Sequence, residues 1–352
     1  MRSVQTGGSD KIEVVETARP VPGPADAVVR IRACGICGTD TQFVHMGGMP
    51  AAWSTAPVPE GTDPQQIVPV VLGHEPAGEI VAVGTEVSGL AVGDHVVVNP
   101  QGAPSGIIGC GGPLGGMSEY LLIQNAVVGS SVAVVPDSVP FDVAAMNEPM
   151  AVARHCVNRS GATPTDKVVV FGAGPIGLGA TIWLKLRGVQ HVVVADIIPS
   201  RLETALAVGA DAVIDSSRED VVARLTELHG VGRNAMGAPR LGTDIYIDAA
   251  GAPVVVDTAI QNGKWKAKLV IVAVHKKPEP VDIGSMLRNE LTIIASQGYP
   301  TEIFEVTPEL AEHADRFEKL ISHRVPFAEI DRAFELAMTP GAAEKVVVTY
   351  GD

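Results

Sequence analysis

A glycine-rich run at residues 172–177 (Gly-Ala-Gly-Pro-Ile-Gly) separates an apolar, strand-like stretch from a helix-like segment at residues 178–186. Gly172 permits a tight turn, Gly174 lets the backbone come close to a pyrophosphate, and Gly177 lets the helix pack on the strand. The N-terminus of such a helix offers free N–H groups and a partial positive charge to phosphates. These residue types and their spacing predict a dinucleotide-binding turn.

An acidic residue stands where such a unit would hold a ribose. A second strand-like stretch, 191–195, ends in Asp196, which lies 19 residues after Gly177. A carboxylate there can accept hydrogen bonds from the adenosine ribose and would repel a 2′-phosphate, so it predicts NAD rather than NADP. Folds that bind S-adenosylmethionine also combine a glycine-rich turn with an acid after the second strand. The unit alone therefore leaves both ligands open.

Four residues outside this unit have the chemistry of metal ligands. Cys37 lies in a glycine-flanked turn after one strand-like stretch, His74 and Glu75 follow another, and Glu148 precedes Pro149. A thiolate, an imidazole and a carboxylate that leave one position open form the donor set of a catalytic zinc site. Taken singly, Cys37 is more simply explained as a small core thiol, His74 as a hydrogen-bonded histidine, and each glutamate as a surface acid or a helix-end charge.

Length and charge limit the classes of protein to consider. The chain has 352 residues, which is enough for two domains. Its net charge of −14 argues against a nucleic-acid surface, because phosphate binding depends on Lys and Arg. The sequence contains no signal-peptide pattern and no apolar run of membrane-spanning length, so we expect a cytoplasmic protein without a membrane partner.

Strand-like and helix-like stretches alternate through the second half of the chain. Helical patterns at 200–208 and 219–228 separate apolar, strand-like runs. This alternation predicts an α/β unit with a doubly wound parallel sheet of about six strands. The expected strands lie at residues 168–171, 191–195, 212–214, 244–248, 269–274 and 291–295.

The N-terminal part of the chain favours β structure instead. Alternating apolar residues and glycines at 78–84 and 92–98 are typical of barrel strands that turn at glycines. Two segments without a clear period, 47–69 and 101–116, are predicted to be loops. A loop as long as the first is usually functional or partly ordered.

Helical patterns surround this β region in sequence. Residues 142–157 favour a helix that Pro149 interrupts. Near the C-terminus, amphipathic patterns at 308–322 and 330–338 precede a last strand at 345–349. We expect this strand to rejoin the N-terminal β region, which makes that domain discontinuous in sequence.

Five motifs occur in order and at suitable separations, and together they resemble those of the medium-chain, zinc-dependent alcohol dehydrogenases. The Gly-His-Glu and Glu-Pro forms resemble the polyol branch, which includes the sorbitol, threonine and 2,3-butanediol dehydrogenases. The long loop before His74 is most similar to that of the butanediol type, and the resemblance covers essentially the whole chain. The five motifs are Cys34–Asp40, Leu72–Glu75, Val92–Val96, Glu148–Val152 and Gly172–Gly177.

The resemblance implies roles for the metal-binding residues. Cys37 and His74 match the thiolate and imidazole ligands of the catalytic zinc. Glu75 matches a carboxylate that binds zinc directly or through water, and Glu148 matches the alternative fourth ligand, which we also count as a catalytic residue. The sequence does not decide which glutamate coordinates at a given step.

The resemblance also implies a route for the substrate proton. Thr39 matches the hydroxyl that takes this proton, and Asp40 matches an acid that orients the zinc-bound histidine. Many relatives carry a histidine five residues after the ligand cysteine, where this chain has Gln42. His45 could replace it, the proton could leave through ribose and water, or His45 could be an exposed loop residue.

The cofactor site and the second metal site complete these expectations. Relatives bind a structural zinc through four closely spaced cysteines, whereas residues 99–120 contain only Cys110. One thiolate cannot hold a tetrahedral zinc, so we predict no structural zinc. The expected cofactors are therefore NAD, as argued from Asp196, and one catalytic zinc per chain. The expected cofactor-binding residues are Gly172, Gly174, Pro175, Ile176, Gly177, Asp196, Arg201 (beside the adenosine), Ala250 and Val274.

The resemblance implies a GroES-like, β-rich catalytic domain at 1–151 and 298–352 and a Rossmann coenzyme domain at 152–297. The implied reaction is reversible, zinc-dependent hydride transfer between a secondary alcohol, such as a vicinal diol or polyol, and NAD. A zinc-free quinone or enone reductase, a non-catalytic NAD-binding protein and a methyltransferase stay open as alternatives. Since relatives are dimers or tetramers, a homodimer or homotetramer that binds a small-molecule substrate and no nucleic acid is expected.

Overall fold

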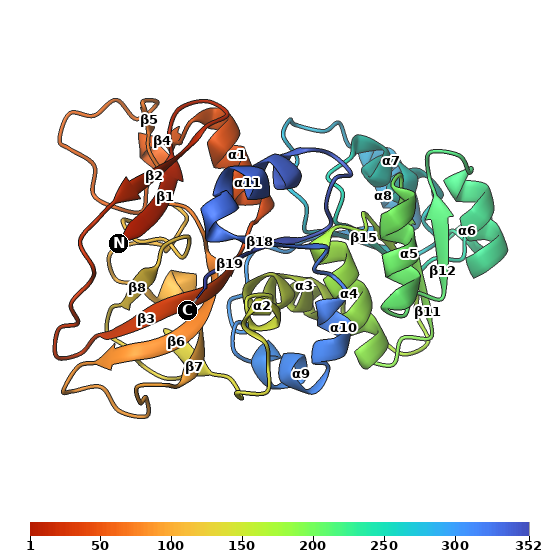
Figure 1. Ribbon diagram of the computed structural model, residues 1–352. Coiled ribbons are helices and arrows are strands. Elements are labelled where there is room, and N and C mark those ends of the chain that lie inside the picture. The colour runs from red at the N-terminus through yellow and green to blue at the C-terminus, as the bar shows by residue number, and fades with distance from the viewer. Residues whose placement is uncertain (352) are drawn as a thin grey trace. The chain divides into compact units, whose positions relative to one another are not determined.

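The computed structural model describes residues 1–351, and it divides the chain into two compact units (Figure 1). Unit 1 contains Met1–Glu148 together with the C-terminal segment that begins at Ile303. Unit 2 contains Pro149–Glu302. None of the helices within residues 1–351 combines the length and the apolar character needed to cross a bilayer.

Unit 2 is built on one sheet in which all five neighbouring pairs of strands are parallel. The strand order is β12-β11-β10-β15-β16-β17, which confirms the predicted six-stranded sheet. The apolar runs of the central strands are buried, as strands covered on both faces require. The strands are β10 (Lys167–Phe171), β11 (His191–Asp196), β12 (Ala212–Asp215), β15 (Ile245–Asp248), β16 (Lys268–Ile271) and β17 (Thr292–Ala295).

Helices connect these strands, and three of them carry proline in the first turn, where no intrahelical hydrogen bond is lost. A short antiparallel ribbon, β13 (Val231–Arg233) with β14 (Pro239–Leu241), precedes β15. The chain runs outward from β10 to β12 and then returns to β15 beside β10, so the order of the strands reverses there. The helices are α4 (Pro175–Leu186), α5 (Pro199–Ala207), α6 (Val221–His229), α7 (Pro253–Asn262) and α8 (Ile283–Asn289).

Unit 1 contains a seven-stranded sheet with the order β18-β19-β3-β6-β7-β9, in which β8 also pairs with β3. The C-terminal β19 is antiparallel to β3, so the predicted return of the last strand to the N-terminal β region is confirmed. The strands are β3 (Ala27–Gly35), β6 (Glu75–Val83), β7 (His95–Val98), β8 (Tyr120–Ile123), β9 (Val132–Val134), β18 (His323–Pro326) and β19 (Val346–Thr349).

Smaller elements complete unit 1. β1 (Arg2–Thr6) and β2 (Ile12–Glu16) form an antiparallel pair. The predicted loop at 47–69 is partly ordered by a short ribbon of β4 (Met49–Pro50) and β5 (Ile67–Val68). The helices are α1 (Gly38–Met46), α2 (Phe141–Ala144), α9 (Val306–Glu312), α10 (Ala314–Glu318) and α11 (Ile330–Met338), with 3-10 turns η1 (Ala51–Trp53), η2 (Pro100–Gly102) and η3 (Phe327–Glu329).

Two predicted helices are placed differently by the structure. Pro149 does not interrupt a helix, because it stands in the first turn of α3 (Asn147–Ser160), where the backbone N–H has no intrahelical acceptor. The break lies before the proline, between α2 and α3. The pattern at 308–322 forms two short helices, α9 and α10, that meet at His313.

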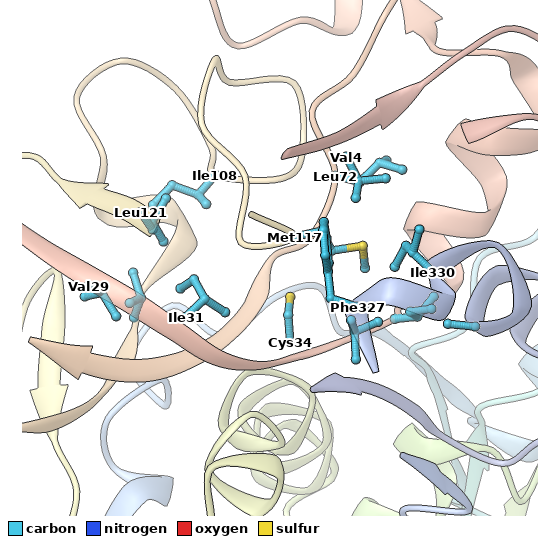
Figure 2. Close-up of a cluster of buried hydrophobic side chains, with 14 of the residues drawn as sticks. Val4, Val29, Ile31, Cys34, Leu72, Ile108, Met117, Leu121, Phe327 and Ile330 are labelled. Atoms are coloured by element: carbon cyan, nitrogen blue, oxygen red, sulfur yellow. The ribbon is translucent and has the colours of Figure 1, made fainter. Parts of the chain in front are cut away.

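A buried apolar cluster holds the strand that leads to the predicted metal ligands (Figure 2). Ile31 and Cys34 of β3 lie in this cluster with Met117 and with Phe327 of η3. Because β3 is fixed by this packing up to its last residues, the turn that follows it starts from a rigid support.

Candidate functional site

Three of the four predicted metal ligands meet where β3 and β6 pair. Cys37 is the N-cap residue of α1, two residues after β3, and the antiparallel register places Gly35 opposite Glu75. The Cys37 Sγ, a ring nitrogen of His74 and a carboxylate oxygen of Glu75 all lie within 4.8 Å of one another. These three residues are the one such group that the structure brings together within residues 1–351.

The chemistry of this cluster fits a zinc ion. Thiolate sulfur, imidazole nitrogen and carboxylate oxygen are the donor types that zinc prefers. Glu75 Oε1 is buried and has no hydrogen-bond partner in the protein. Leaving a buried polar atom unpaired costs about 1–3 kcal/mol, so a bound cation gives a physical reason for this arrangement.

Asp40 joins the two segments that carry the ligands. Its fully buried carboxylate accepts hydrogen bonds from Cys37 N (2.9 Å) and from Gly73 N (3.0 Å). Oδ1 also lies 3.7 Å from His74 Nδ1. Burial raises the pKa of Asp40, although His74 and the two N–H donors partly offset this effect. Asp40 therefore positions His74 relative to the start of α1.

His74 is surrounded by negative groups. Burial alone would lower the pKa of His74, but the charges of Asp40, Cys37 and Glu148 raise it well above its usual value. A buried imidazole in such a field attracts a cation, which is either a proton or a metal ion, and metal binding releases the proton.

Lys345 completes the cluster, and nothing in the sequence had pointed to it. This lysine is only 2% exposed, and its Nζ donates to Ile36 O (3.0 Å) and to Glu75 Oε2. It immediately precedes β19, and pairing of β19 with β3 brings it to residue 36. Burial would lower the pKa of Lys345, but Glu75 and Cys37 raise it, so the ammonium balances part of the negative charge.

The other predicted catalytic residues lie in the same unit. Thr39 Oγ1 is 3.7 Å from Cys37 Sγ. Glu148 stands in the first turn of α3 and is nearly buried, and its charge acts on His74, although its carboxylate is not in the three-residue group. His45 lies in the last turn of α1 rather than in a loop, and its exposed ring contacts Asp10 Oδ1 at 2.5 Å.

The segment around Cys110 is held by hydrogen bonds to the loop after η1. Gly111 O accepts from Thr55 N (3.2 Å) and Ala56 N (3.0 Å), and Thr55 Oγ1 accepts from Ile107 N (2.9 Å). A Cβ added at Gly109 would lie 2.0 Å from the carbonyl oxygen of Gly73, so this segment packs directly against the residue before His74. Burial raises the pKa of the Cys110 thiol.

The glycine-rich turn of unit 2 has the geometry predicted for phosphate binding. Gly172 has a φ of +95°, and a Cβ at Gly177 would lie 1.8 Å from the Gly172 carbonyl oxygen. Gly174 is the N-cap residue of α4, and a Cβ there would meet no atom within 4 Å. Pro175 and Ile176 form the first turn of α4. The open space at a helix N-terminus fits a pyrophosphate.

The remaining predicted cofactor residues lie along the carboxyl edge of the same sheet. Asp196 ends β11, and its carboxylate accepts from Ala173 N (2.6 Å) and Ile198 N (2.9 Å) while each oxygen keeps a further lone pair for a ribose hydroxyl. Arg201 is in the first turns of α5. Ala250 and Val274 follow β15 and β16 respectively, and the Val274 side chain is 72% exposed.

Known proteins share both units. Residues 23–136 match the alcohol dehydrogenase GroES-like domain, and residues 175–314 match the zinc-binding dehydrogenases. The (R,R)-butanediol dehydrogenase of Neisseria gonorrhoeae is 29% identical, with 99% of each chain covered. The L-galactonate-5-dehydrogenase of Escherichia coli is 32% identical over 90% of this chain and 89% of that relative.

A solved structure agrees with these sequence matches. The crystal structure of 2R,3R-butanediol dehydrogenase from Bacillus subtilis is 27% identical and superposes with a TM-score of 0.82 over 99% of both chains. The predicted fold, a GroES-like domain with a Rossmann-type parallel sheet, is therefore confirmed. Together with the Cys37–His74–Glu75 cluster and the glycine-rich turn, these matches show that the chain belongs to the medium-chain, zinc-dependent alcohol dehydrogenases.

Proposed function

We propose that this dehydrogenase oxidises a secondary alcohol of a vicinal diol or polyol to the ketone with NAD, reversibly, at the site formed by Cys37, His74 and Glu75. The three-donor cluster, in which His74 and Glu75 are buried and Cys37 is half-buried, carries the proposal, because its donor types are those of a catalytic zinc site. The similarity to dehydrogenases named for butanediol and galactonate supports a substrate with more than one hydroxyl group. A screen of diols and polyols with NAD tests the substrate class, and turnover of simple monoalcohols alone would contradict it.

We assign the following roles to the residues of the site. Cys37 and His74, with Glu75 or Glu148, would hold a zinc ion, which as a Lewis acid would lower the pKa of the substrate hydroxyl. Thr39 accepts the hydroxyl proton and passes it toward water. Asp40 keeps His74 in place through its hydrogen bonds to the adjoining backbone. A bound NAD would supply the hydride acceptor, so that oxidation of the carbinol carbon would give the ketone and NADH.

Metal content separates this proposal from its alternatives. We expect one zinc per chain, measured by elemental mass spectrometry on protein purified without added metal. Residues 99–120 contain one cysteine, so a second zinc has no tetrahedral donor set there. Two zinc ions per chain would contradict this single-metal proposal. Active protein without zinc would favour the zinc-free quinone or enone reductases, and zinc-containing protein without turnover of any alcohol would favour a non-catalytic role.

Asp196 is expected to make the enzyme selective for NAD. Its buried carboxylate would repel the 2′-phosphate of NADP, so we expect kcat/KM to be at least about 100-fold higher with NAD. Asp196→Ser should reduce this ratio by about tenfold or more. The matched control is Asp215→Ser at the corresponding end of β12, which should leave the ratio unchanged. Equal kcat/KM values for both cofactors in the unmodified enzyme would refute the assignment.

The roles of the two units and the state of the protein in the cell belong to the same proposal. We assign catalysis to residues 1–151 with 298–352 and coenzyme binding to residues 152–297.

β17 is the last strand of its sheet, and such an edge is available for pairing with a second copy. We expect a homodimer or homotetramer by light scattering and cytoplasmic recovery on cell fractionation. A monomer, or recovery with membranes, would contradict these two assignments.

A further inference from the structure

The carboxyl ends of β10 and β15 lie where the strand order of unit 2 reverses, and β16 is the next strand beyond β15. In doubly wound sheets a dinucleotide binds outside the carboxyl ends of the strands at this reversal. The glycine-rich turn and Asp196 belong to the half formed by β10, β11 and β12. The half formed by β15, β16 and β17 is therefore left for the nicotinamide nucleotide.

One buried carboxylate organises that second half. Asp248 is the last residue of β15 and is fully buried. Its Oδ1 accepts hydrogen bonds from Ala250 N (3.0 Å) and Gly251 N (2.8 Å), which fixes the turn after β15. Its Oδ2 lies 2.7 Å from Nε2 of His275, a residue in the segment that follows β16. The Asp248–His275 pair therefore connects the segments that follow two neighbouring strands.

These segments also pack directly against each other, and the segment after β15 packs against the glycine-rich turn. A Cβ at Gly172 would lie 2.9 Å from the Ala249 carbonyl oxygen, and a Cβ at Gly251 would lie 2.9 Å from the Val274 carbonyl oxygen. The side chain of Val274, next to His275, remains exposed at this edge. An exposed apolar side chain next to the turn that follows β15 suits the face of a flat ring.

The surroundings of His275 indicate a purpose beyond folding. Its side chain is 16% exposed, and Nδ1 is buried without a hydrogen-bond partner, 3.9 Å from Glu279 Oε1. An unpaired buried nitrogen is unfavourable for stability, so fold stability alone does not explain a histidine here. The bond from Nε2 to Asp248 holds the imidazole and the adjoining backbone in one orientation.

We propose that His275 is a positioning residue for the nicotinamide end of the dinucleotide. By binding Asp248, it keeps Val274 and the Ala250–Gly251 turn in the arrangement that receives the nicotinamide nucleotide. The adenosine end is held independently by the glycine-rich turn and Asp196. This inference rests on the proposed use of NAD by the enzyme.

The test compares two ligands on the same zinc-containing enzyme. NADH and ADP-ribose share the adenosine, the pyrophosphate and the second ribose, but only NADH carries nicotinamide. For His275→Ala we expect the Kd of NADH to rise about tenfold, as typically follows from loss of a positioning partner, while the Kd of ADP-ribose changes less than about twofold. Calorimetric titration measures both constants, and their ratio is unaffected by any unfolded fraction of the variant.

Two further variants make the result specific. His275→Gln keeps a side-chain N–H that can reach Asp248, so it should restore the NADH Kd to within about threefold of the original. His191→Ala, an exposed histidine at the amino end of β11, should change neither constant. Equal weakening of both ligands, or unchanged NADH binding in His275→Ala, would overturn the inference. If the unmodified enzyme binds NADH and NAD no more tightly than it binds ADP-ribose, the proposed function itself is wrong.

Discussion

Replacing Cys37 by serine is expected to remove the bound zinc and to lower kcat/KM by about 1,000-fold or more. Cys37 supplies the thiolate of the three-donor cluster, and a neutral hydroxyl is a much poorer zinc ligand. Without the metal, the substrate hydroxyl keeps its high pKa, so the alkoxide that would donate the hydride does not form at neutral pH. Zinc per chain and initial rates with a diol and NAD measure the two effects together.

Two neighbouring residues provide matched controls for this loss. Cys110→Ser removes a thiol outside the three-residue group and should leave one zinc per chain. Thr39→Val should also keep the zinc and bind NADH normally, while kcat falls about 100-fold because the proton acceptor is gone. A Cys37→Ser protein that retains one zinc and its activity would show that the metal ligands have been assigned wrongly. An unchanged rate in Thr39→Val would exclude that residue from proton transfer.

The second large effect is expected at Lys345, whose replacement by methionine should lower the free energy of unfolding by about 3–5 kcal/mol. Lys345 and Glu75 form an ion pair in which both side chains are at most 2% exposed. Removing the ammonium leaves a buried carboxylate without its counter-charge and Ile36 O without its donor. Urea denaturation of the chelator-treated protein measures the loss without a contribution from bound metal.

Two further variants test the cause of this loss: one removes both charges of the buried pair, and the other breaks an exposed ion pair. Lys345→Met combined with Glu75→Gln removes both charges and should recover a large part of the lost stability. Lys185→Met breaks the more exposed pair with Asp211 and should cost only about 0–1 kcal/mol. If Lys345→Met and Lys185→Met lower the free energy of unfolding by the same amount, the buried pair contributes no more to stability than the exposed one. If the double variant is no more stable than Lys345→Met, an unpaired Glu75 is not the cause of the loss.

Local patterns in the sequence determined most of unit 2. The strand runs around the glycine-rich turn and the distance to Asp196 depend on neighbouring residues, so period and spacing were sufficient to place β10, α4 and β11. Element ends were less well determined: the structure ends β16 at Ile271, whereas the apolar run continues to Val274. The added residues are apolar, but they follow the last strand pairing and lie at the edge of the proposed cofactor site.

Sequence also indicated the chemistry of the metal cluster, because Cys37, His74 and Glu75 each follow or begin a strand-like run. It could not show that Glu148 stays outside the three-residue group or that Pro149 lies in the first turn of α3. Family membership, rather than the glycine-rich turn by itself, decided against the S-adenosylmethionine alternative.

Only the tertiary structure revealed the Lys345–Glu75 ion pair and the Asp248–His275 contact. Lys345 and Glu75 are separated by 270 residues, and Asp248 and His275 by 27. Neither pair has a local signature, because each forms only when the register of a sheet brings two strand ends together. Hydrophobic period and glycine spacing depend on a residue's neighbours in sequence, whereas the counter-charge of Glu75 and the side-chain partner of Asp248 depend on which strands pair.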